Sequence, residues 1–390
     1  MKNIYFVQAN RIYGGTDGKR GSTYIPYATG CIAAYAWADE RVAQNYHLGR
    51  FIYARENISE AIDSLDNPFM VAFSCSVWNA EYNKVFAKKL KEKYPDCLVL
   101  FGGHNVPPGN KYLEELPYVD LLIHNGGEEP FLAILLSLLD SSPLDEIPNI
   151  SFRNASENIT TRDVMQTATE YPSPYLNGIF DEILKDDIDF SVIIETNRGC
   201  PNSCAFCDWG YLKSKVRLFP MEKVRAELDW ISERGIDYVF CCDGNFGLFD
   251  RDEEIADYII DLKKRTGHPQ NFRVCFTKNR CDFVRKIGVK FFESRLDKAQ
   301  TLSFQSMSPE VLENIGRKNI SNDHFCNLMA LYNEINISTF SELIMALPGE
   351  TYESFCDGLC KLIEYGQHKS VEVYPCELLP NSKMGSPEYI

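Results

Sequence analysis

Residues 195–210 read Glu-Thr-Asn-Arg-Gly-Cys-Pro-Asn-Ser-Cys-Ala-Phe-Cys-Asp-Trp-Gly and place three thiols, Cys200, Cys204 and Cys207, within eight residues. Thiolates are soft ligands that select zinc, copper(I) or iron–sulfur clusters. A structural zinc ion takes four protein ligands, and no fourth cysteine or histidine follows nearby. Three ligands instead suit a four-iron cluster with one iron left open. The alternatives are a zinc site with a remote fourth ligand, or three unrelated buried thiols.

The cysteine stretch directly follows a short apolar strand, and the chain beyond it alternates between strands and amphipathic segments. The six expected strands are 191–195, 238–242, 272–276, 301–305, 339–345 and 371–374. Six strands in about 190 residues predict a partial parallel (β/α)6 barrel rather than a complete eight-stranded one. Such barrels carry their active sites on the loops after the strands, where the three cysteines lie.

The first 140 residues also alternate between strands and helices. The expected strands are 4–9, 69–74, 97–101 and 119–124, and the expected helices are 56–65, 79–94 and 131–139. Repeated β-α units predict a Rossmann-like, doubly wound parallel sheet, in which ligands bind beyond the carboxyl ends of the strands. We therefore predict an α/β protein with a Rossmann-like domain at 1–140, a linker with at most a small hairpin at 141–185, and the barrel at 186–390.

The composition argues against several kinds of partner and location. The 390 residues include 55 acidic and 40 basic side chains, and the resulting net charge of −15 disfavours a nucleic-acid partner. No apolar run is long enough for a transmembrane helix, and the N-terminus turns polar too soon for a signal peptide. We therefore expect a cytoplasmic protein without a membrane partner.

The spacing of the three cysteines carries a family resemblance. Three and then two residues separate Cys200, Cys204 and Cys207, and the aromatic Phe206 precedes the last. In this pattern the sequence resembles the radical SAM superfamily. The resemblance implies a [4Fe-4S] cluster on the three thiolates, S-adenosylmethionine on the fourth iron, and Phe206 as a cofactor contact. It also implies reductive cleavage to a 5′-deoxyadenosyl radical, with an electron donor such as flavodoxin or ferredoxin.

Two further segments resemble parts of that family that contact S-adenosylmethionine. Residues 241–247 resemble the segment at its methionine end, which implies that Asp243 and Asn245 bind it and that the carboxylate accepts from its ammonium group. The alternative is a turn with a locally bonded carboxylate and amide. The strand around Ser303 and Gln305 resembles the one that meets the ribose, and strand periodicity points both side chains the same way. Filling the barrel interior is the alternative for this pair.

Three more features are interpreted through the same resemblance. Glu342 begins a segment similar to the fifth-strand motif that supports the adenine, in which Ala346 replaces the usual second glycine. Arg317 would pair with the cofactor carboxylate, and a surface salt bridge is the alternative. Trp209 and Tyr211, just past the cysteines, would form a wall of the cofactor site or pack in the core.

The N-terminal domain resembles that of the subgroup of radical SAM enzymes that binds cobalamin (vitamin B12). The segments 27–30, 74–79, 102–105 and 126–131 carry the similarity. It implies these cobalamin-binding candidates: Ser74, Trp78, Gly102, Gly103, His104, Gly126 and Gly127. The Asp-x-His-x-x-Gly motif that supplies an axial histidine elsewhere is absent. The alternative is a domain that keeps the fold and has lost the cofactor.

These features together predict a cobalamin-dependent radical SAM enzyme that functionalises an unactivated carbon of a small molecule or peptide, most often by methylation. One alternative is a radical SAM enzyme without cobalamin, such as a methylthiotransferase. That class commonly adds a basic RNA-binding domain, which the charge of −15 disfavours. The other is a truncated, non-catalytic protein that binds a cluster or corrin. Because the sequence ends soon after the sixth strand, we expect an open barrel or one that a partner completes.

Overall fold

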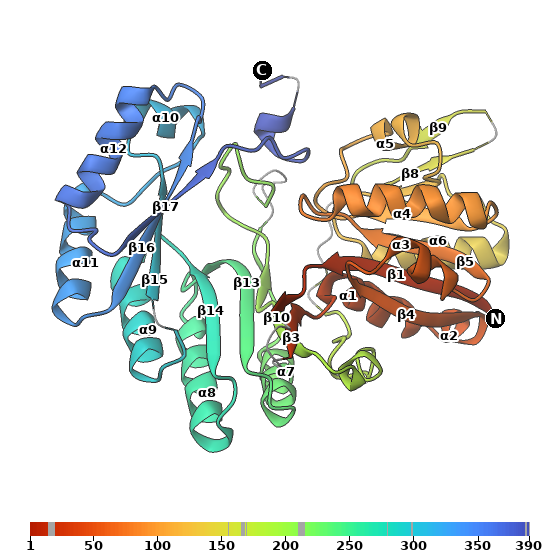
Figure 1. Ribbon diagram of the computed structural model, residues 1–390, viewed down its shortest axis with the longest axis horizontal. Coiled ribbons are helices and arrows are strands. Elements are labelled where there is room, and N and C mark those ends of the chain that lie inside the picture. The colour runs from red at the N-terminus through yellow and green to blue at the C-terminus, as the bar shows by residue number, and fades with distance from the viewer. Residues whose placement is uncertain are drawn as a thin grey trace. The chain divides into compact units, whose positions relative to one another are not determined.

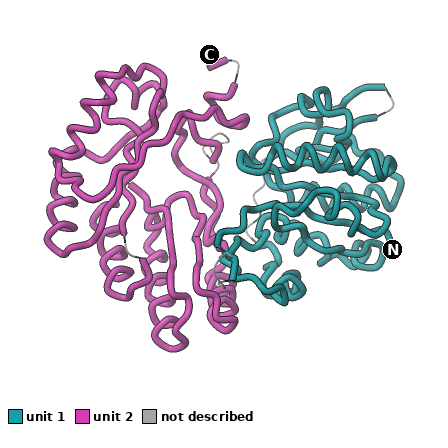
Figure 2. Tube along the Cα trace, in the orientation of Figure 1, with its two compact units in different colours: residues 1–192 teal, residues 193–390 magenta. Residues whose placement is uncertain are grey.

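The computed structural model describes residues 1–14, 20–154, 156–164, 168, 170–209, 215–278, 280–297, 299–386 and 388–389. The chain folds into two compact units, Met1–Val192 and Ile193–Ile390 (Figure 2). The predicted domain boundaries at residues 140 and 185 stay a prediction. No helix in the described ranges is long and apolar enough to cross a membrane.

The first unit is built on a seven-stranded sheet with the order β4-β1-β5-β6-β7-β8-β9 (Figure 1). Its strands are β1 (Lys2–Asn10), β4 (Tyr46–Ala54), β5 (Pro68–Ser74), β6 (Leu98–Gly102), β7 (Leu121–Ile123), β8 (Ile150–Arg153) and β9 (Asn158–Thr160). The five strands from β4 to β7 are parallel, which confirms the predicted doubly wound sheet. β8 and β9 form a hairpin that adds to the edge in antiparallel pairing.

Helices cover both faces of this sheet. They are α1 (Tyr27–Trp37), α2 (Glu40–Asn45), α3 (Ile58–Asp63), α4 (Ala80–Lys93), α5 (Lys111–Glu115) and α6 (Glu128–Asp140). On β1, Phe6 stacks on Phe51 with ring centroids 5.6 Å apart and contacts Phe131 of α6 at 5.2 Å. Its neighbours Tyr5 and Val7 belong to the apolar cluster that includes residues of α3, α4 and α5. The apolar run of β1 is therefore buried on both faces, as parallel sheets require.

The strand order places a topological switch point between β1 and β5, which are hydrogen-bonded neighbours. The chain after β1 leads to α1, which packs against α6, whereas the chain after β5 enters α4, which packs against α3. Ligands of doubly wound sheets bind where the connections diverge in this way, outside the carboxyl ends of the two strands. In this unit that place lies beyond Asn10 and Ser74.

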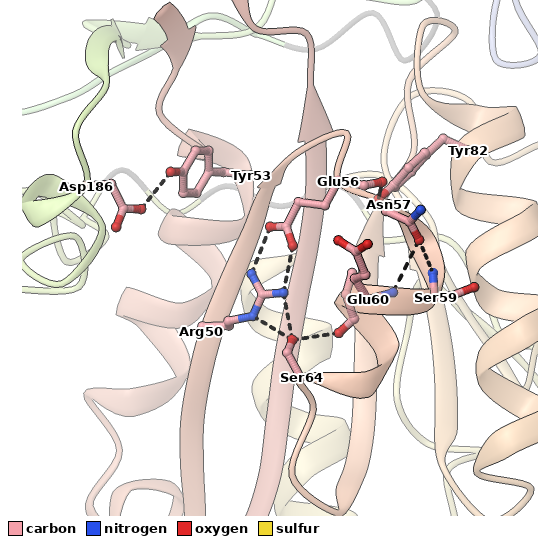
Figure 3. Close-up of polar contacts among 10 residues, drawn as sticks. Arg50, Tyr53, Glu56, Asn57, Ser59, Glu60, Ser64, Tyr82 and Asp186 are labelled. Carbon is pink, nitrogen blue, oxygen red and sulfur yellow. Dashed lines mark hydrogen bonds and ion pairs between the residues drawn. The ribbon is translucent and has the colours of Figure 1, made fainter. Parts of the chain in front are cut away.

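The edge strand β4 is tied to neighbouring elements by polar side chains (Figure 3). Arg50 forms two hydrogen bonds of 2.8 Å to the Glu56 carboxylate and also donates to the Ser64 hydroxyl. Further along, Tyr53 donates to Asp186 at 2.6 Å, and burial raises the pKa of this phenol. Edge strands are otherwise open to pairing with other chains, and these contacts restrict that edge.

The second unit contains the six strands that we predicted for the barrel, and the partial (β/α)6 architecture is confirmed (Figure 1). The strands are β10 (Asp189–Ile194, which spans the division between the units), β13 (Tyr238–Phe246), β14 (Asn271–Phe276), β15 (Ala299–Gln305), β16 (Ser338–Met345) and β17 (Ser370–Pro375). The intervening helices are α7 (Met221–Glu233), α8 (Arg251–Thr266), α9 (Cys281–Glu293), α10 (Pro309–Asn314), α11 (Asn322–Glu334) and α12 (Tyr352–Glu364). β13 pairs with β14, and β15 with β16 and β17, all in parallel.

The remaining elements are short. β2 (Tyr13–Gly14) and β3 (Gly21–Tyr24) pair in antiparallel fashion after β1. β11 (Asn197–Arg198) and β12 (Arg217–Leu218) form a two-residue ribbon at the base of the cysteine loop. Two 3-10 turns lie at Ile183–Lys185 and Lys383–Gly385. Of these elements, the ribbon β11–β12 matters most for the site, because it holds the two ends of the cysteine loop together.

Candidate functional site

The three cysteines lie on the loop that leaves β11 and returns at β12. Gly199 precedes the first cysteine and has a φ of +112°, a conformation that only glycine adopts without strain. Cys200 is buried, whereas Cys204 and Cys207 are half-buried. The loop therefore presents two sulfurs toward its surface and one toward the protein interior.

The middle of the loop is anchored to the end of α10 and to the C-terminal segment. The Ala205 N–H donates to the Ile315 carbonyl at 2.8 Å, and the Met384 N–H donates to the Ala205 carbonyl at 2.9 Å. Ala205 lies in an apolar cluster with Ile315 and Met384, and Phe206 packs against that cluster. Phe206 thus anchors the loop, while its predicted contact with a cofactor stays a prediction.

The donor set of this loop fits an iron–sulfur cluster. Within the described ranges, no three His, Cys, Asp or Glu side chains are arranged around a single ion. A [4Fe-4S] cluster does not require that arrangement, because each cysteine binds its own iron at a separate corner. Hydrogen bonds to the sulfurs, which such clusters commonly receive, are present at Cys200 and Cys204.

Asp243, on β13, is buried and holds the segment that leads into the cysteine loop. The backbone N–H groups of Thr196 (2.8 Å) and Asn197 (3.2 Å) donate to its Oδ1, and the Thr196 hydroxyl and the Asn197 amide (2.7 Å) donate to its Oδ2. Four donors fill the acceptor positions of a carboxylate. Asp243 therefore binds the protein itself, and its predicted contact with the cofactor ammonium group stays a prediction. Burial raises the pKa of Asp243 to about 7, although the hydrogen bonds from Thr196 and Asn197 act in the opposite direction.

Asn245 lies two residues further along β13 and contacts the first cysteine directly. Its side-chain Nδ2 donates to Cys200 Sγ at 3.1 Å. Asn202, inside the loop, donates to Asn245 Oδ1 at 3.3 Å and lies 3.7 Å from the same sulfur. The structure therefore joins Asn245 to Cys200, and the predicted contact of Asn245 with S-adenosylmethionine stays a prediction.

Arg317 is buried beside the second cysteine. Its guanidinium donates to the Ser303 carbonyl at 2.6 Å and to Asn319 Oδ1 at 3.0 Å, and it lies 3.8 Å from Cys204 Sγ. Burial lowers the pKa of Arg317, and the neighbouring Cys204 opposes that shift. These contacts hold the guanidinium in the interior, so the surface salt bridge that was the alternative for Arg317 is wrong.

Ser303 and Glu342 are direct partners on β15 and β16, and the Ser303 hydroxyl donates to the Glu342 carboxylate. The structure thus brings two of the predicted S-adenosylmethionine contacts together. The register shifts between Ser303 and Gln305, and Gln305 has a φ of +66°. The regular alternation of side chains along β15, on which we based the common orientation of Ser303 and Gln305, therefore stops before Gln305. Ala346 also has a φ of +66°, a conformation that favours glycine and suits the residue usual at this position.

Trp209 follows the cysteines and is partly exposed. It packs close to the backbone of β13, because a Cβ added to Gly244 would lie 3.2 Å from the Trp209 ring and 4.0 Å from Cys200 Cβ. Glycine at 244 therefore allows the ring and the first cysteine to approach the strand. Tyr211, which we expected to act with Trp209, lies outside the described residues.

In the first unit, exposed apolar side chains follow both strands of the switch point. Val77 and Trp78 follow β5, and Ile12 and Tyr13 follow β1, and all four are exposed, Trp78 by 64%. The Ser74 carbonyl accepts from the Asn79 and Asn83 amides, which fixes the start of the loop that carries Trp78. An exposed apolar patch at a switch point is typical of a ligand site.

The other cobalamin candidates follow β6 and β7 at the same edge of the sheet. His104 is exposed after β6, and Gly126 and Gly127 are half-buried after β7. His124, which the sequence analysis did not single out, is buried next to them and bonds to Ser151 Oγ at 2.9 Å. Burial lowers the pKa of His124, which favours its neutral form.

Replacing Gly103 with alanine is expected to destabilise the first unit by about 3 kcal/mol. Gly103 has a φ of +100°, and an added Cβ would lie 2.7 Å from the Cys75 carbonyl oxygen. That carbonyl accepts from the Asn105 N–H, so the backbone cannot move away without losing a bond. Urea denaturation measures the change. Gly102→Ala is the matched control, because its Cβ would meet no atom closer than 3.6 Å. Equal effects of the two variants would contradict this account.

Three residues of the site were missed from the sequence: Thr196, Asn197 and Asn202. The first two are bonded to Asp243, 46 and 47 residues further along, and no local pattern reports such a contact. Asn202 lies between two of the cysteines, and its position was the one available signal.

The comparisons with known proteins agree with this arrangement. Residues 194–358 match the family described as the radical SAM superfamily. The chain is 37% identical to the 2-(S-pantetheinyl)-carbapenam-3-carboxylate methyltransferase of Streptantibioticus cattleyicolor, over 100% of this chain and 57% of that protein. It is also 37% identical, with the same coverage, to the cobalamin-dependent radical SAM methyltransferase TokK of Streptomyces tokunonensis. The chain thus spans 57% of the length of these relatives.

A solved structure shares the fold across both units. The radical S-adenosylmethionine methyltransferase TsrM from Kitasatospora setae, determined with cobalamin and a [4Fe-4S] cluster bound, superposes with a TM-score of 0.70 at 14% identity. The match covers 99% of this chain and 74% of that one. At this identity the likeness supports the fold assignment alone.

Proposed function

We propose that this chain, which belongs to the radical SAM superfamily, is the cluster- and cobalamin-binding part of an enzyme that methylates an unactivated carbon. The proposal depends on one observation. The whole chain is 37% identical both to the carbapenam carboxylate methyltransferase and to the cobalamin-dependent radical SAM methyltransferase TokK. One of these acts on a pantetheinyl carbapenam carboxylate, which favours a small molecule over a peptide as the substrate.

The cysteine loop is where we place the cluster, on Cys200, Cys204 and Cys207. When bound, the cluster supplies the electron for reductive cleavage of S-adenosylmethionine, and cobalamin supplies a carrier for the methyl group. The chain's own residues hold the loop in place. Asp243 fixes its entry, Phe206 anchors its middle, and the ribbon β11–β12 joins its ends.

For S-adenosylmethionine we propose a site toward the carboxyl ends of β15 and β16. Glu342, from the segment predicted to support the adenine, accepts from Ser303, which is predicted to meet the ribose, so the two candidate contacts lie together. Arg317 lies beside Cys204 and would pair with the carboxylate of the cofactor. Gln305 follows the bulge in β15 and stays a proposed contact of the same cofactor.

For cobalamin we propose the switch point of the first unit. The exposed side chains of Tyr13, Val77 and Trp78, which follow β1 and β5, are apolar groups of the kind that a corrin ring would cover. The glycine turns after β6 and β7 leave room for backbone to approach a ligand. Because no histidine motif for cobalt is present, we expect the lower face of the ring to lack a histidine ligand.

Anaerobic reconstitution tests the proposed function. Protein treated with iron, sulfide and hydroxocobalamin should retain about four irons and one corrin after gel filtration. Reductant and S-adenosylmethionine should then yield 5′-deoxyadenosine. Cluster without retained corrin would reject the cobalamin-dependent reaction and favour a radical SAM enzyme of another class. Cluster and corrin without 5′-deoxyadenosine would favour a non-catalytic binding protein.

We further propose that an acidic electron carrier, such as flavodoxin or ferredoxin, docks beside the cluster loop. Lys278 and Lys318 line a small recess that also reaches Cys204 and the buried Arg317, on a chain whose net charge is −15. A local positive patch speeds the association of an oppositely charged partner about tenfold or more. Electron transfer requires close approach to the cluster, which favours this patch as the docking place.

Reversing both lysine charges, K278E with K318E, is expected to slow cluster reduction by flavodoxin about tenfold at low salt. Stopped-flow absorbance follows the reduction, with a photoreduced deazaflavin as the small reductant whose rate should not fall. K264E with K369E is the matched control, because Lys264 and Lys369 precede β14 and β17 and so lie at the opposite edge of the barrel strands. A similar slowing in that control would contradict docking at this recess.

A further inference from the structure

We infer that Asn245, oriented by Asn202, sets the reduction potential of the cluster through its hydrogen bond to Cys200. This inference rests on the proposed function, because it requires a cluster on the three cysteines. It assigns Asn245 a positioning and tuning role at the sulfur, distinct from contact with S-adenosylmethionine. The argument depends on three features: the hydrogen bond itself, the orientation of the amide, and the burial of the sulfur.

The hydrogen bond is short for one that ends on sulfur. Nδ2 of Asn245 lies 3.1 Å from Cys200 Sγ, and Nδ2 of Asn202 lies 3.7 Å from the same atom. Both the amide of Asn245 and the Cys200 thiol are 8% exposed. In such a low-dielectric place a hydrogen bond is electrostatically stronger than it is in water.

The orientation of the Asn245 amide follows from its second contact. Asn202 Nδ2 donates to Asn245 Oδ1 at 3.3 Å, so the oxygen faces Asn202 and the nitrogen faces the sulfur. The backbone that carries Asn245 is fixed two residues earlier, where Asp243 accepts four hydrogen bonds from Thr196 and Asn197. The amide is therefore held in place before any cluster binds.

The physical consequence concerns the charge of the cluster. Reduction adds an electron to a centre whose thiolates already carry negative charge, and an N–H dipole aimed at a thiolate stabilises that extra charge. Removing the dipole makes reduction harder and moves the potential in the negative direction. The effect is local to Cys200, because Cys204 has a different donor, the Arg317 guanidinium at 3.8 Å.

The test is a redox titration of the reconstituted N245L variant, monitored by electron paramagnetic resonance. We expect the cluster content of the wild type and a midpoint potential at least 59 mV more negative, which is a tenfold smaller ratio of reduced to oxidised cluster at the wild-type midpoint. N314L is the matched control. Asn314 lies on α10, and its amide donates to the Pro348 carbonyl at 3.1 Å rather than to a sulfur. Its midpoint should not move.

The outcomes separate this inference from the proposed function. A wild type that binds no cluster would remove the proposed function itself. A wild type and an N245L variant that bind equal cluster and share one midpoint would overturn only the tuning role. If the leucine variant loses iron, N245A decides, because alanine removes the donor and adds no charge. An N245A midpoint equal to that of the wild type would then overturn the inference, and a more negative one would support it.

Discussion

Alanine at Cys200, Cys204 and Cys207 together is expected to abolish the binding of iron and sulfide by the reconstituted chain. The three thiolates of one loop are the complete set of protein ligands that we assign to the cluster. Anaerobic reconstitution followed by iron and sulfide analysis should give about four of each for the wild type and none for the variant. The visible absorbance of the cluster should disappear in parallel.

The matched control replaces three cysteines elsewhere in the second unit, Cys275, Cys326 and Cys360. These thiols are exposed or half-buried and lie on β14, α11 and α12. This control should retain the cluster of the wild type. If the Cys200, Cys204 and Cys207 variant keeps its iron while the control loses it, the assignment of the ligands is wrong.

The triple alanine variant of Cys200, Cys204 and Cys207 should still bind cobalamin in its first unit. The switch-point residues Tyr13, Val77 and Trp78 belong to the unit Met1–Val192, which has its own apolar cluster. We therefore expect retained corrin in a variant that has lost all iron. This behaviour would also show that the iron is lost from its site rather than through unfolding of the whole chain.

The strands of both units could be predicted where the chain gives a local signal. The six barrel strands and β1, β5, β6 and β7 are short apolar runs between turns, and all ten were expected. β4 was missed because His47, Gly49 and Arg50 interrupt its apolar pattern, and as an edge strand it tolerates them. Helix α1 was missed because it is buried on most of its surface and so shows no polar stripe. Its Gly30 lies against the Phe180 ring, where an added Cβ would clash.

The candidate site could also be predicted only where its residues form a local sequence pattern, and not where they depend on distant contacts. The spacing of Cys200, Cys204 and Cys207 is a local pattern, and the chemistry of thiolates identified it as a metal site. The role of Asp243 was not local, because its partners Thr196 and Asn197 lie on another strand connection. The sequence pattern around a carboxylate on a strand is the same whether its side chain binds a ligand or the protein backbone. Only the fold distinguishes the two.

Asparagine at position 243 is the second change with a large expected effect. The substitution turns one acceptor oxygen into an NH2 group, which then faces N–H donors of Thr196 and Asn197. Each buried donor that loses its acceptor costs about 1–3 kcal/mol. We expect the variant to be destabilised by about 3 kcal/mol and to retain less iron, because the segment that leads into Cys200 loses its anchor.

The pH dependence of this effect follows from the raised pKa. Burial raises the pKa of Asp243 from 3.8 to about 7 in the folded chain. Between these values the unfolded chain releases the proton while the folded chain keeps it, so stability falls as the pH rises. Most of this loss falls between pH 3.8 and about pH 7, the unfolded and folded pKa values of Asp243. The asparagine variant has no such titration, so the difference in stability between wild type and variant should narrow from pH 5 to pH 8.

Urea denaturation of both proteins at pH 5, 6, 7 and 8 measures that difference. D261N is the matched control, since Asp261 on α8 is an exposed carboxylate whose replacement removes the same charge. Its stability should follow that of the wild type at every pH. A gap between wild type and D243N that stays constant across this range would mean that Asp243 is ionised throughout in the folded chain. In that case the four hydrogen bonds, rather than burial, would control its charge. A gap that narrows would show that the carboxyl group anchoring the cysteine loop takes up its proton near neutral pH, and that burying its ionised form lowers the stability of the folded chain.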